Sequence, residues 1–359
     1  MSKIIQIVLR PLDYYFFGTN ETFDFGAKGI KNFSVKSNPL PQQTGLLGLM
    51  RHAFFLAGYE TGNSFDPGQT NHDFGLIQTI SPLYLINNNG EALYKCPIPL
   101  QKTNENEVIS PSFNTLDVVA IYNNQPVKQT FSASNYNPKK EWAAKWANIS
   151  TREKVEDSHL FRSETHIGID KGKTNKKQTD EGAFYKQQFY RLSNAAIAFQ
   201  AVVDDQVDIS KLPLLLPFGG EKRMFSISYS AEGFLTWDNI RAKVTGLFKE
   251  YLPESGSCIM LLTDTYVHYL KELEETISYA VLQAKPFRNI ITPKTVSNFS
   301  RIGSNAGDNK QLFKPAETTY ILKQGSLLFT DRESEERILE ILTHDGFSTI
   351  GYNQFIKNF

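Results

Sequence analysis

Periodic apolar positions divide the chain into strands and helices from its first residues onward. Residues 3–18 (KIIQIVLRPLDYYFFG) are rich in β-branched and aromatic side chains, which predicts an opening strand. Pro41 and Thr44 precede a run in which apolar residues recur at helical spacing from Leu46 to Ala53, and the run closes near Gly58. The chain therefore opens with a strand, an irregular loop and a helix.

The middle of the chain continues with patterns of both periods. The Asn-Asn-Asn-Gly sequence at 87–90, between two apolar runs, predicts a hairpin. The polar stretch 101–140 predicts loop with short strands. The other predicted elements are a short helix over 138–150 with Trp142 and Trp146 on one face, a long hairpin over 164–192 whose second arm runs on as a strand to 205, and a short apolar helix after 209 that turns at Gly219 and Gly220 into a strand.

A second unit begins near Asp238. Its predicted elements are a helix over 238–252, a buried strand over 257–267, an irregular segment over 286–310, paired strands over 318–330, a helix over 333–345 and a last strand over 347–356. The order strand, helix, hairpin, helix, strand in the first unit is typical of a ferredoxin-like domain. The strand-helix-strand close of the second indicates a similar α+β module.

These elements predict an α+β fold with two ferredoxin-like (RRM-like) domains. The first domain covers 1–237 and carries a long protruding β-hairpin, a thumb, at about 164–192; the second covers 238–359. A chain of 359 residues with 40% hydrophobic and 13% aromatic content can build two such cores.

Composition excludes several classes of protein. The 38 Lys and Arg residues balance the 38 Asp and Glu residues, so no overall field attracts nucleic acid or an anionic membrane. The first apolar run is interrupted by Gln6 and Arg10 and is too short for a secretory or membrane-spanning segment. Cys96 and Cys258 lie far apart without a CxxC motif, which argues against a disulfide framework or a zinc site. We expect a cytoplasmic protein without cofactor or metal.

One segment departs from the charge balance. Four of the seven residues at 171–177 are lysine and none is acidic, and aromatic and β-forming residues flank the segment. A lysine run is most often a solvated hairpin tip. The alternative is that the lysines bind backbone phosphates and release counterions.

Four sequence motifs, in this order, resemble one family. Residues 40–54 (LPQQTGLLGLMRHAF) resemble the Pro-x-x-Thr-x-x-Gly-x-x-Arg helix start of the RAMP proteins of CRISPR systems. Residues 166–185 resemble the basic thumb hairpin of the third subunit of the type III-B (Cmr) effector complex. FGGEKR at 218–223 resembles that subunit's Gly-Gly-Glu-x-Arg turn, and FSTIGYNQF at 347–355 its closing Gly-Tyr-Gly-like strand. Two positions differ from the family pattern, where Glu317 and Asn353 stand in place of glycine.

The resemblance implies a non-catalytic RNA-binding subunit in antiviral defence. It would cap the 5′ handle of the CRISPR RNA with two ferredoxin-like domains and place its thumb between guide and target RNA near the handle. Its neighbours would be the large polymerase-type subunit and the first backbone subunit of the Cmr complex.

The candidate RNA-binding residues come from the same motifs. They are Thr44, Gly45, Arg51, His166, Lys171, Lys173, Lys176, Lys177, Tyr185, Lys222 and Arg223. A helix start attracts phosphate through its N–H groups, lysines follow a backbone, and aromatic rings stack on bases. Thr44 could equally be an ordinary N-cap, and the two glycines of FGGEKR a helix C-cap before a strand.

Catalysis is the main alternative function. Relatives of RAMP proteins use a histidine to process CRISPR repeat RNA, and this chain has six histidines, of which His166 at the thumb base is the one we would test. The His72-Asp73 pair lacks further ligands at metal-site spacing. A third possibility is a scaffold whose thumb docks only protein.

Overall fold

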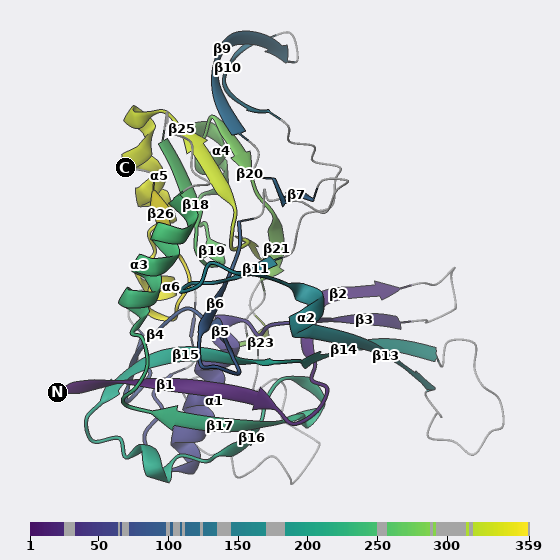
Figure 1. Cartoon of the computed structure of the whole chain (residues 1–359), viewed down its shortest axis with the longest axis vertical. Helices are drawn as coiled ribbons and strands as arrows, with labels where there is room; N and C mark the ends of the chain where they lie inside the picture. Colours follow the sequence, from purple (N-terminus) through teal and green to yellow (C-terminus); the bar gives the residue numbers. More distant parts are fainter. Residues whose placement is uncertain are drawn as a thin grey trace.

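The nine-stranded sheet of the amino-terminal half is the largest element of the molecule (Figure 1). The computed structural model describes residues 1–24, 33–63, 65–66, 72–97, 101–102, 108–109, 112–122, 125–134, 145–169, 184–249, 257–287, 290–291, 314–315 and 319–357. In this sheet the strands follow the order β12 (Lys154–Glu156), β11 (Lys145–Asn148), β6 (Ala92–Lys95), β5 (Tyr84–Asn87), β15 (Ala195–Asp204), β1 (Ser2–Pro11), β17 (Met224–Ser230) and β16 (Leu215–Pro217), and β4 (Ile77–Ile80) also pairs with β15.

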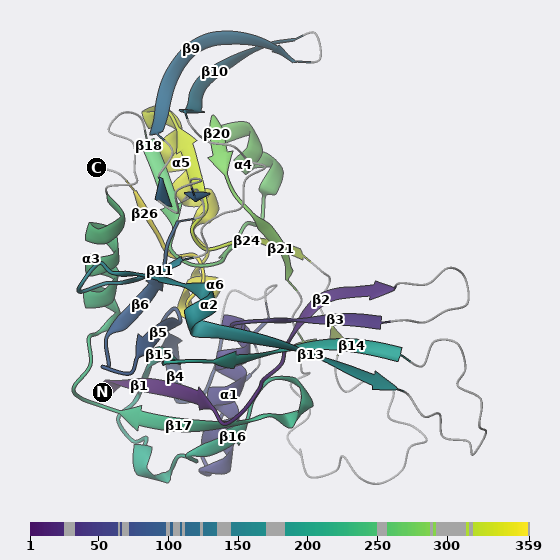
Figure 2. The same ribbon diagram turned by 45° about the vertical axis from the view of Figure 1, so that its right-hand side comes forward.

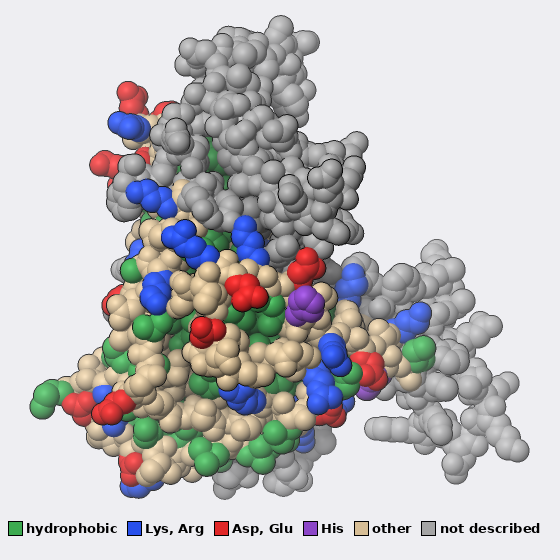
Figure 3. All heavy atoms as spheres, viewed as in Figure 1, with side chains coloured by type: hydrophobic (Ala, Val, Ile, Leu, Met, Phe, Trp, Pro, Cys, Tyr) green, Lys and Arg blue, Asp and Glu red, His purple; other side chains and the backbone are tan. Residues whose placement is uncertain are grey.

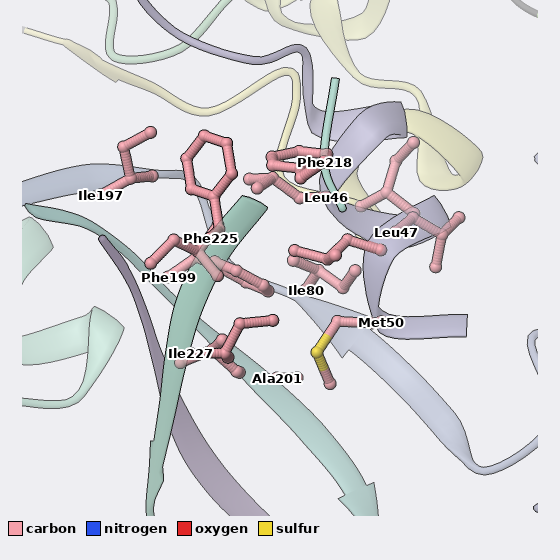
Figure 4. Packing of buried hydrophobic residues seen from close by; sticks show 14 of the residues in the cluster. Leu46, Leu47, Met50, Ile80, Ile197, Phe199, Ala201, Phe218, Phe225 and Ile227 are labelled. Carbon is pink, nitrogen blue, oxygen red and sulfur yellow. The ribbon is translucent and has the colours of Figure 1, made fainter. Parts of the chain in front are cut away.

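Helix α1 (Gln43–Leu56) covers one face of this sheet. Leu46, Met50 and Phe54 of the helix are fully buried in one cluster with alternate residues of the central strands, such as Ile7 of β1 and Phe199 of β15. Figure 4 shows Leu46, Met50 and Phe199 in this cluster. A fully buried side chain of this size contributes roughly 1.5–3 kcal/mol. The helical spacing of α1 and the alternation of β1 together determine this layer.

The carboxy-terminal half forms a second antiparallel sheet. Its order is β20 (Tyr279–Val281), β25 (Leu327–Thr330), β18 (Ser257–Leu261) and β26 (Phe355–Lys357). Four strands of each half can be compared in chain order: β1, β5, β15 and β17 in the amino-terminal half, and β18, β20, β25 and β26 in the carboxy-terminal half. In both sets the first strand lies between the third and the fourth, and the second strand pairs with the third. The two halves therefore share one strand order.

The layers of the molecule stack on these two sheets. Helix α3 (Trp237–Phe248) and the second sheet pack on the face of the first sheet opposite α1, in a cluster that includes Ala196, Val244 and Met260. Helices α4 (Leu270–Thr276) and α5 (Arg332–Leu342) cover the outer face of the second sheet. The predicted division at residue 237 stays a prediction, but two of the three clusters of buried residues contain residues from both sides of it.

A smaller sheet joins the two halves near the start of α1. It consists of β19 (Thr265–Tyr266), β24 (Thr319–Leu322) and β21 (Ala284–Phe287). Tyr266 stacks on Phe347 of α6 (Asp345–Thr349) with ring centroids 4.3 Å apart, and both rings belong to the same core cluster as α1.

Two strand pairs project from the body (Figure 2). Strands β13 (Phe161–Ile169) and β14 (Phe184–Leu192) form an antiparallel pair, and β14 adds β3 (Phe33–Asn38) and β2 (Phe17–Asp24) to make a four-stranded sheet. Strands β9 (Ser112–Tyr122) and β10 (Gln125–Ser134) form a long ribbon at the other end of the molecule. The remaining short elements are α2 (Asp157–Leu160), the 3-10 turns at Ile209–Lys211 and Gly220–Lys222, and the strand pairs β7–β8 (Gln101–Lys102 and Val108–Ile109) and β22–β23 (Ile290–Ile291 and Lys314–Pro315).

Several sequence predictions are confirmed. The opening strand, the helix after Pro41, the hairpin turning at 87–90 and the helices at 237–248 and 332–342 all form. The arms of the hairpin predicted at 164–192 pair along their described length.

Six predictions of local structure are wrong. Residues 112–134 form a long ribbon rather than loop with short strands. Trp146 lies in strand β11, because pairing with β6 and β12 overrides its helical spacing from Trp142. Strand β15 is separate from the second hairpin arm, since the chain turns at Asn194, whose φ is 57°.

The other three errors lie near prolines and in the carboxy-terminal half. No apolar helix follows residue 209, because Pro213 and Pro217 interrupt it and the segment forms β16. The strands predicted at 318–330 pair in different sheets, β24 with β19 and β21, and β25 with β18 and β20. The predicted last strand at 347–356 begins as helix α6 and becomes a strand only at Phe355. In the described part of the chain, no helix is long and apolar enough to cross a bilayer.

The loop before the last strand depends on Gly351. Its φ is 84°, and a Cβ at this position would overlap Gln43 of α1 and lie 2.7 Å from the Ser81 carbonyl oxygen. Asn353 also has a positive φ of 53°; its side chain accepts a hydrogen bond from the Tyr266 amide at 2.9 Å and donates to the Leu342 carbonyl at 2.7 Å. An asparagine can therefore replace the family's glycine here.

We expect Gly351→Ala to lower the free energy of unfolding by about 3 kcal/mol. The alanine would have to adopt a left-handed backbone conformation, and its Cβ would overlap Gln43. Thermal and urea unfolding would measure the loss. The control is Gly246→Ala in α3, where an added Cβ meets nothing within 4 Å and the change should be neutral or stabilising. Equal stability of the two variants would contradict this account of the loop.

Candidate nucleic-acid interface

Three of the motif stretches contact one another, and Phe189 connects them to His166 at the start of the thumb motif, so that together they form a continuous band. The band begins where Gly351 and Tyr352 meet the first turn of α1. Burial raises the pKa of the Tyr352 hydroxyl, which lies beside Thr44 and the backbone of Gln43 without a hydrogen bond of regular geometry to either. Gln42 is the N-cap residue of α1, so half-buried Thr44 lies within the first turn and is not the cap.

The start of α1 contacts the Gly-Gly-Glu-x-Arg turn through Gly45. A Cβ at Gly45 would lie 3.7 Å from the ring of Phe218, the first residue of that turn. The next two glycines pack on Phe16: the Gly220 amide donates to the Phe16 carbonyl at 2.8 Å, and a Cβ at Gly220 would lie 2.6 Å from the Phe16 ring. Any larger side chain would push the turn off Phe16.

The turn does not end in the strand expected from the sequence. Lys222 is exposed with a φ of 50°, and β17 begins only at Met224. Lys222 and Arg223 therefore lie in the turn and not on alternating sides of a strand. Arg223 is half-buried, with its guanidinium carbon 5.0 Å from the centre of the Phe189 ring, and its buried Nε has no hydrogen-bond partner among the described atoms.

Phe189 connects the turn to the base of the projecting hairpin. This buried ring of β14 contacts Phe16 at 5.7 Å and His166 of β13 at 4.7 Å, measured between centroids. The structure thus brings His166 and Arg223, which lie 57 positions apart in sequence, onto one aromatic ring.

A short hydrogen-bonded chain orients His166. Its Nε2 lies 3.0 Å from the Glu164 carboxylate, and the Tyr14 hydroxyl donates to the same carboxylate. The hydrogen bond from Tyr14 and then that from His166 hold the pKa of Glu164 below its ordinary value. The bond to Glu164 likewise raises the pKa of Tyr14.

Two arginines face each other across the hairpin. Arg162 of β13 is directly opposite Arg191 of β14, and both are exposed. Arg191 also lies 6.0 Å above the Tyr14 ring. We call the surface formed by Tyr14, His166, Phe189, Arg191 and Arg223 the hairpin-base face. Figure 3 shows Lys and Arg side chains near the place where this hairpin leaves the body.

Other predicted residues lie apart from this face. Arg51 binds two carbonyl oxygens of the loop after α1, from Nε to Thr61 at 2.9 Å and from Nη2 to Gly62 at 3.0 Å, and burial lowers its pKa. The four thumb lysines, Lys171, Lys173, Lys176 and Lys177, lie outside the described residues. Tyr185 pairs with Gly168 in the hairpin register, but its side chain is outside the description.

The described histidines show no metal site. Within the described segments, no three His, Cys, Asp or Glu side chains are grouped as a metal ion would require. His72 stacks between Phe65 and Phe74, with centroids 4.9 Å and 5.4 Å away, so it belongs to the packing between the two halves.

Sequence reasoning missed several members of the band. Tyr14 and Phe16 belong to the run DYYFFG, which was interpreted only as the end of a strand. Glu164 and Arg162 precede His166 by two and four residues. Because side chains of a strand alternate between its two faces, the sequence could have placed both on the same face of the hairpin as His166. The proximity of Gln43 and Tyr352 had no signal in the sequence.

The family comparison agrees with this convergence of motifs. The family model described as CRISPR-associated protein (Cas_Cmr3) matches residues 7–356. The chain belongs to this Cas_Cmr3 family. No curated protein matches the sequence at significant similarity.

Solved structures share the fold of this Cmr3-family chain. A chain of the structure described as "Cryo-EM structure of the Type III-B Cmr-beta bound to cognate target RNA" is 14% identical, with a TM-score of 0.53 and coverage of 98% of this chain and 96% of that chain. A chain of the corresponding structure with cognate target RNA and AMPPnP, state 1, is 11% identical, with a TM-score of 0.51 and the same coverage. At these identities the likeness concerns the fold alone.

We expect Tyr14→Phe to raise the pKa of Glu164 toward its ordinary value, because the variant removes the strongest donor to that carboxylate. An NMR titration of the Glu164 side-chain carboxyl would measure the change. Tyr229→Phe is the control, since the Tyr229 hydroxyl donates to Pro213 and leaves Glu164 untouched. A Glu164 pKa that stays low in Tyr14→Phe would rule out the hydrogen-bonded chain.

Proposed function

We propose that this chain is a non-catalytic, RNA-binding subunit of a type III-B CRISPR effector complex in antiviral defence. It caps the 5′ handle of the CRISPR RNA and links the first backbone subunit to the large polymerase-type subunit. Family membership supports this assignment, and the similar chains come from complexes described as bound to cognate target RNA.

The main structural support for RNA binding is the pair of opposed arginines, Arg162 and Arg191. Like charges directly opposite on neighbouring strands destabilise a sheet. Arg162 and Arg191 occupy such a pair. The acidic side chain nearest to them on β13, Glu164, is bound to Tyr14 and His166, and Asp13 lies near Tyr14 and Glu164. A polyanion that lies across both strands would relieve this repulsion and gain from counterion release. The arrangement supports a phosphate backbone crossing the base of the hairpin.

The other groups of the hairpin-base face support the same ligand. Arg223 is half-buried beside Phe189, and its Nε has no hydrogen-bond partner among the described atoms, so its guanidinium charge is not committed to a described carboxylate or carbonyl through that atom. The His166 side chain is 43% exposed and its ring rests on Phe189, so it is available for stacking on a base. Single-stranded RNA is recognised by such combinations of aromatic faces and cationic groups.

We also propose that each half is a ferredoxin-like domain. The shared strand order supports this, since the first strand is central and the pairs are antiparallel in both halves. In the carboxy-terminal half α4 and α5 occupy the two helical connections. In the amino-terminal half α1 supplies the first, and the segment with β16 and two 3-10 turns replaces the second. Such modules would hold the guide by contacts to its backbone while base pairing selects the target.

We expect the double variant Arg162→Gln/Arg191→Gln to bind single-stranded guide RNA about tenfold more weakly. The slope of log K against log salt concentration should fall in magnitude by about 1.4, which corresponds to two lost phosphate contacts. Thermal stability should be equal or higher, because the repulsion is removed. Fluorescence anisotropy at several salt concentrations and thermal unfolding would measure both effects.

The matched control for this experiment is Lys211→Gln/Lys271→Gln. It removes two exposed charges elsewhere, on the 3-10 turn at 209–211 and on α4. Equal RNA affinity and salt slope in the two double variants would contradict the proposed interface. Crosslinking of the hairpin to protein alone would favour a docking scaffold instead.

Incubation of the purified protein with repeat RNA, without metal, tests the absence of catalysis. We expect the RNA to remain intact over hours, as the proposed non-catalytic role requires. His166 is the residue to test, because its hydrogen bond to Glu164 is the kind of pairing that a general base uses. Cleavage that disappears in His166→Ala would show that the chain is an endoribonuclease. Tyr269→Ala, at an exposed ring distant in sequence from the hairpin, controls for a contaminating nuclease.

A further inference from the structure

The nine-stranded sheet is covered on both faces at its centre but on one face at its β16 edge. On the side of α1, Leu9, Leu216 and Phe225 of its last three strands belong to one core cluster. On the opposite side, β1 contributes Val8 to the cluster with α3 and the second sheet, and that cluster contains no residue of β17 or β16. The outward side of these strands beyond Val8 therefore lies open.

We call this uncovered side of β1, β17 and β16 the open sheet face. Strand alternation and the pairing register place seven residues on it: Arg10, Leu12, Leu215, Pro217, Met224, Ser226 and Ser228. Figure 3 shows hydrophobic side chains along the lower edge of the body, where β16 and β17 lie in the matching view of Figure 1.

An apolar row crosses the open sheet face. The Leu12 amide donates to the Met224 carbonyl at 3.1 Å, and Met224 is opposite Pro217 in the register. Leu215 lies beside this row on the same side of β16. The exposed fractions of Leu12 and Leu215 are 58% and 50%. Contiguous exposed apolar side chains of this kind mark interaction surfaces.

The open sheet face carries one charge, that of Arg10. None of its seven residues is acidic, and Arg10 is exposed without an ion pair to any residue that the structure describes. A surface that faces only water normally mixes charges of both signs. One cation is too few for an RNA backbone, whose affinity comes from several phosphate contacts. The chemistry therefore suits a protein that brings apolar side chains and a carboxylate for Arg10.

The edge of β16 is unsuited to pairing with a further strand. The Ile227 amide of β17 donates to the Leu214 carbonyl at 2.8 Å, so alternation directs the backbone of Leu215 and Pro217 away from β17. Proline has no N–H to offer a neighbour, and a short edge strand with a proline resists strand addition. A partner must therefore pack on the open sheet face and not pair with its edge.

We infer that the open sheet face docks an amphipathic segment of a protein partner. Apolar side chains of the segment pack on Leu12, Leu215 and Met224, and one of its carboxylates binds Arg10. The inference rests on the proposed function, in which the large polymerase-type subunit and the first backbone subunit are the neighbours. The open sheet face shares no residue with the hairpin-base face, so the two surfaces can be tested separately.

Biolayer interferometry with the full chain and each of these two subunits, without RNA, tests the docking surface. We expect a subunit to bind, and Leu215→Ser/Met224→Ser to weaken it by at least about tenfold, as expected for apolar side chains at the centre of an interface. The control, Leu270→Ser/Leu282→Ser, changes two comparably exposed side chains of the second half and should bind like the original protein.

Variants of Arg10 test the charge. Arg10→Glu should weaken binding more than Arg10→Gln, because it places a negative charge opposite the partner's carboxylate. The difference between the two variants should shrink at high salt concentration, since salt screens exposed charges. Equal affinity of both variants at low salt would show that no carboxylate meets Arg10 and would overturn the inferred chemistry of the partner.

Three results would overturn the docking surface itself. The first is the failure of both subunits to bind the original chain. The second is equal affinity of Leu215→Ser/Met224→Ser and its control when thermal unfolding shows both to be folded. The third is a dimer of the isolated chain that Leu215→Ser/Met224→Ser alone dissociates, which would make the face a contact between two copies. If that variant does not fold, Leu12→Ser replaces it.

Guide RNA binding by the same variants separates this inference from the proposed function. We expect Leu215→Ser/Met224→Ser to bind RNA normally; weaker RNA binding with unchanged subunit binding would overturn the inference. If RNA binding depends on Arg162 and Arg191 while no subunit responds to the open sheet face, the inference fails and the proposed RNA interface stands. If a subunit responds and RNA does not bind, the reverse holds.

Discussion

Small side chains on one face of the nine-stranded sheet determine how the two halves of the chain meet. Strand β15 directs Ile197 and Phe199 toward α1, and Ala196 and Ala198 toward the second sheet. Alanines of β6 and β11 continue this face. Alanine adds little thickness, so α3 and the second sheet cover β15 and bury both of its faces, while larger side chains of the neighbouring strands, such as Tyr84 and Tyr94, fill the same cluster. The motif band depends on this contact, since it takes residues from both halves, and the open sheet face begins where the contact ends.

Glycines permit a second set of close contacts along the band. At Gly220 and Gly351, the backbone lies where a Cβ would overlap Phe16 and Gln43, respectively. These contacts bring the turn at 218–223 against the hairpin base and the last loop against α1. The motif glycines therefore act by letting parts of the protein approach one another. The charged residues that would meet RNA, Arg191 and Arg223 among them, are positioned as a consequence.

The sequence predictions are accurate where an element depends on residues close together in the chain, and they fail where it depends on pairing with a distant segment. Helices α1 and α5 were predicted because their apolar spacing is local. Trp146 was assigned to a helix because its spacing from Trp142 is helical, whereas pairing with distant β6 makes it a strand residue. Among the candidate site residues, His166 and Arg223 meet on Phe189, but Arg51 binds loop carbonyls. A side chain's partner in another element has no local pattern to reveal it.

The sequence by itself determined helices α1, α3 and α5, the opening strand, the hairpin at 87–90, the arms of the basic hairpin and the four motifs that relate the chain to its family. These properties depend on the periodicity and identity of neighbouring residues. Only the tertiary structure decided that the motifs touch, that Arg162 opposes Arg191, and that the second half leaves the outward side of β17 and β16 open. The physical reason is that these arrangements arise from register, small-residue packing and backbone approach between segments distant in sequence.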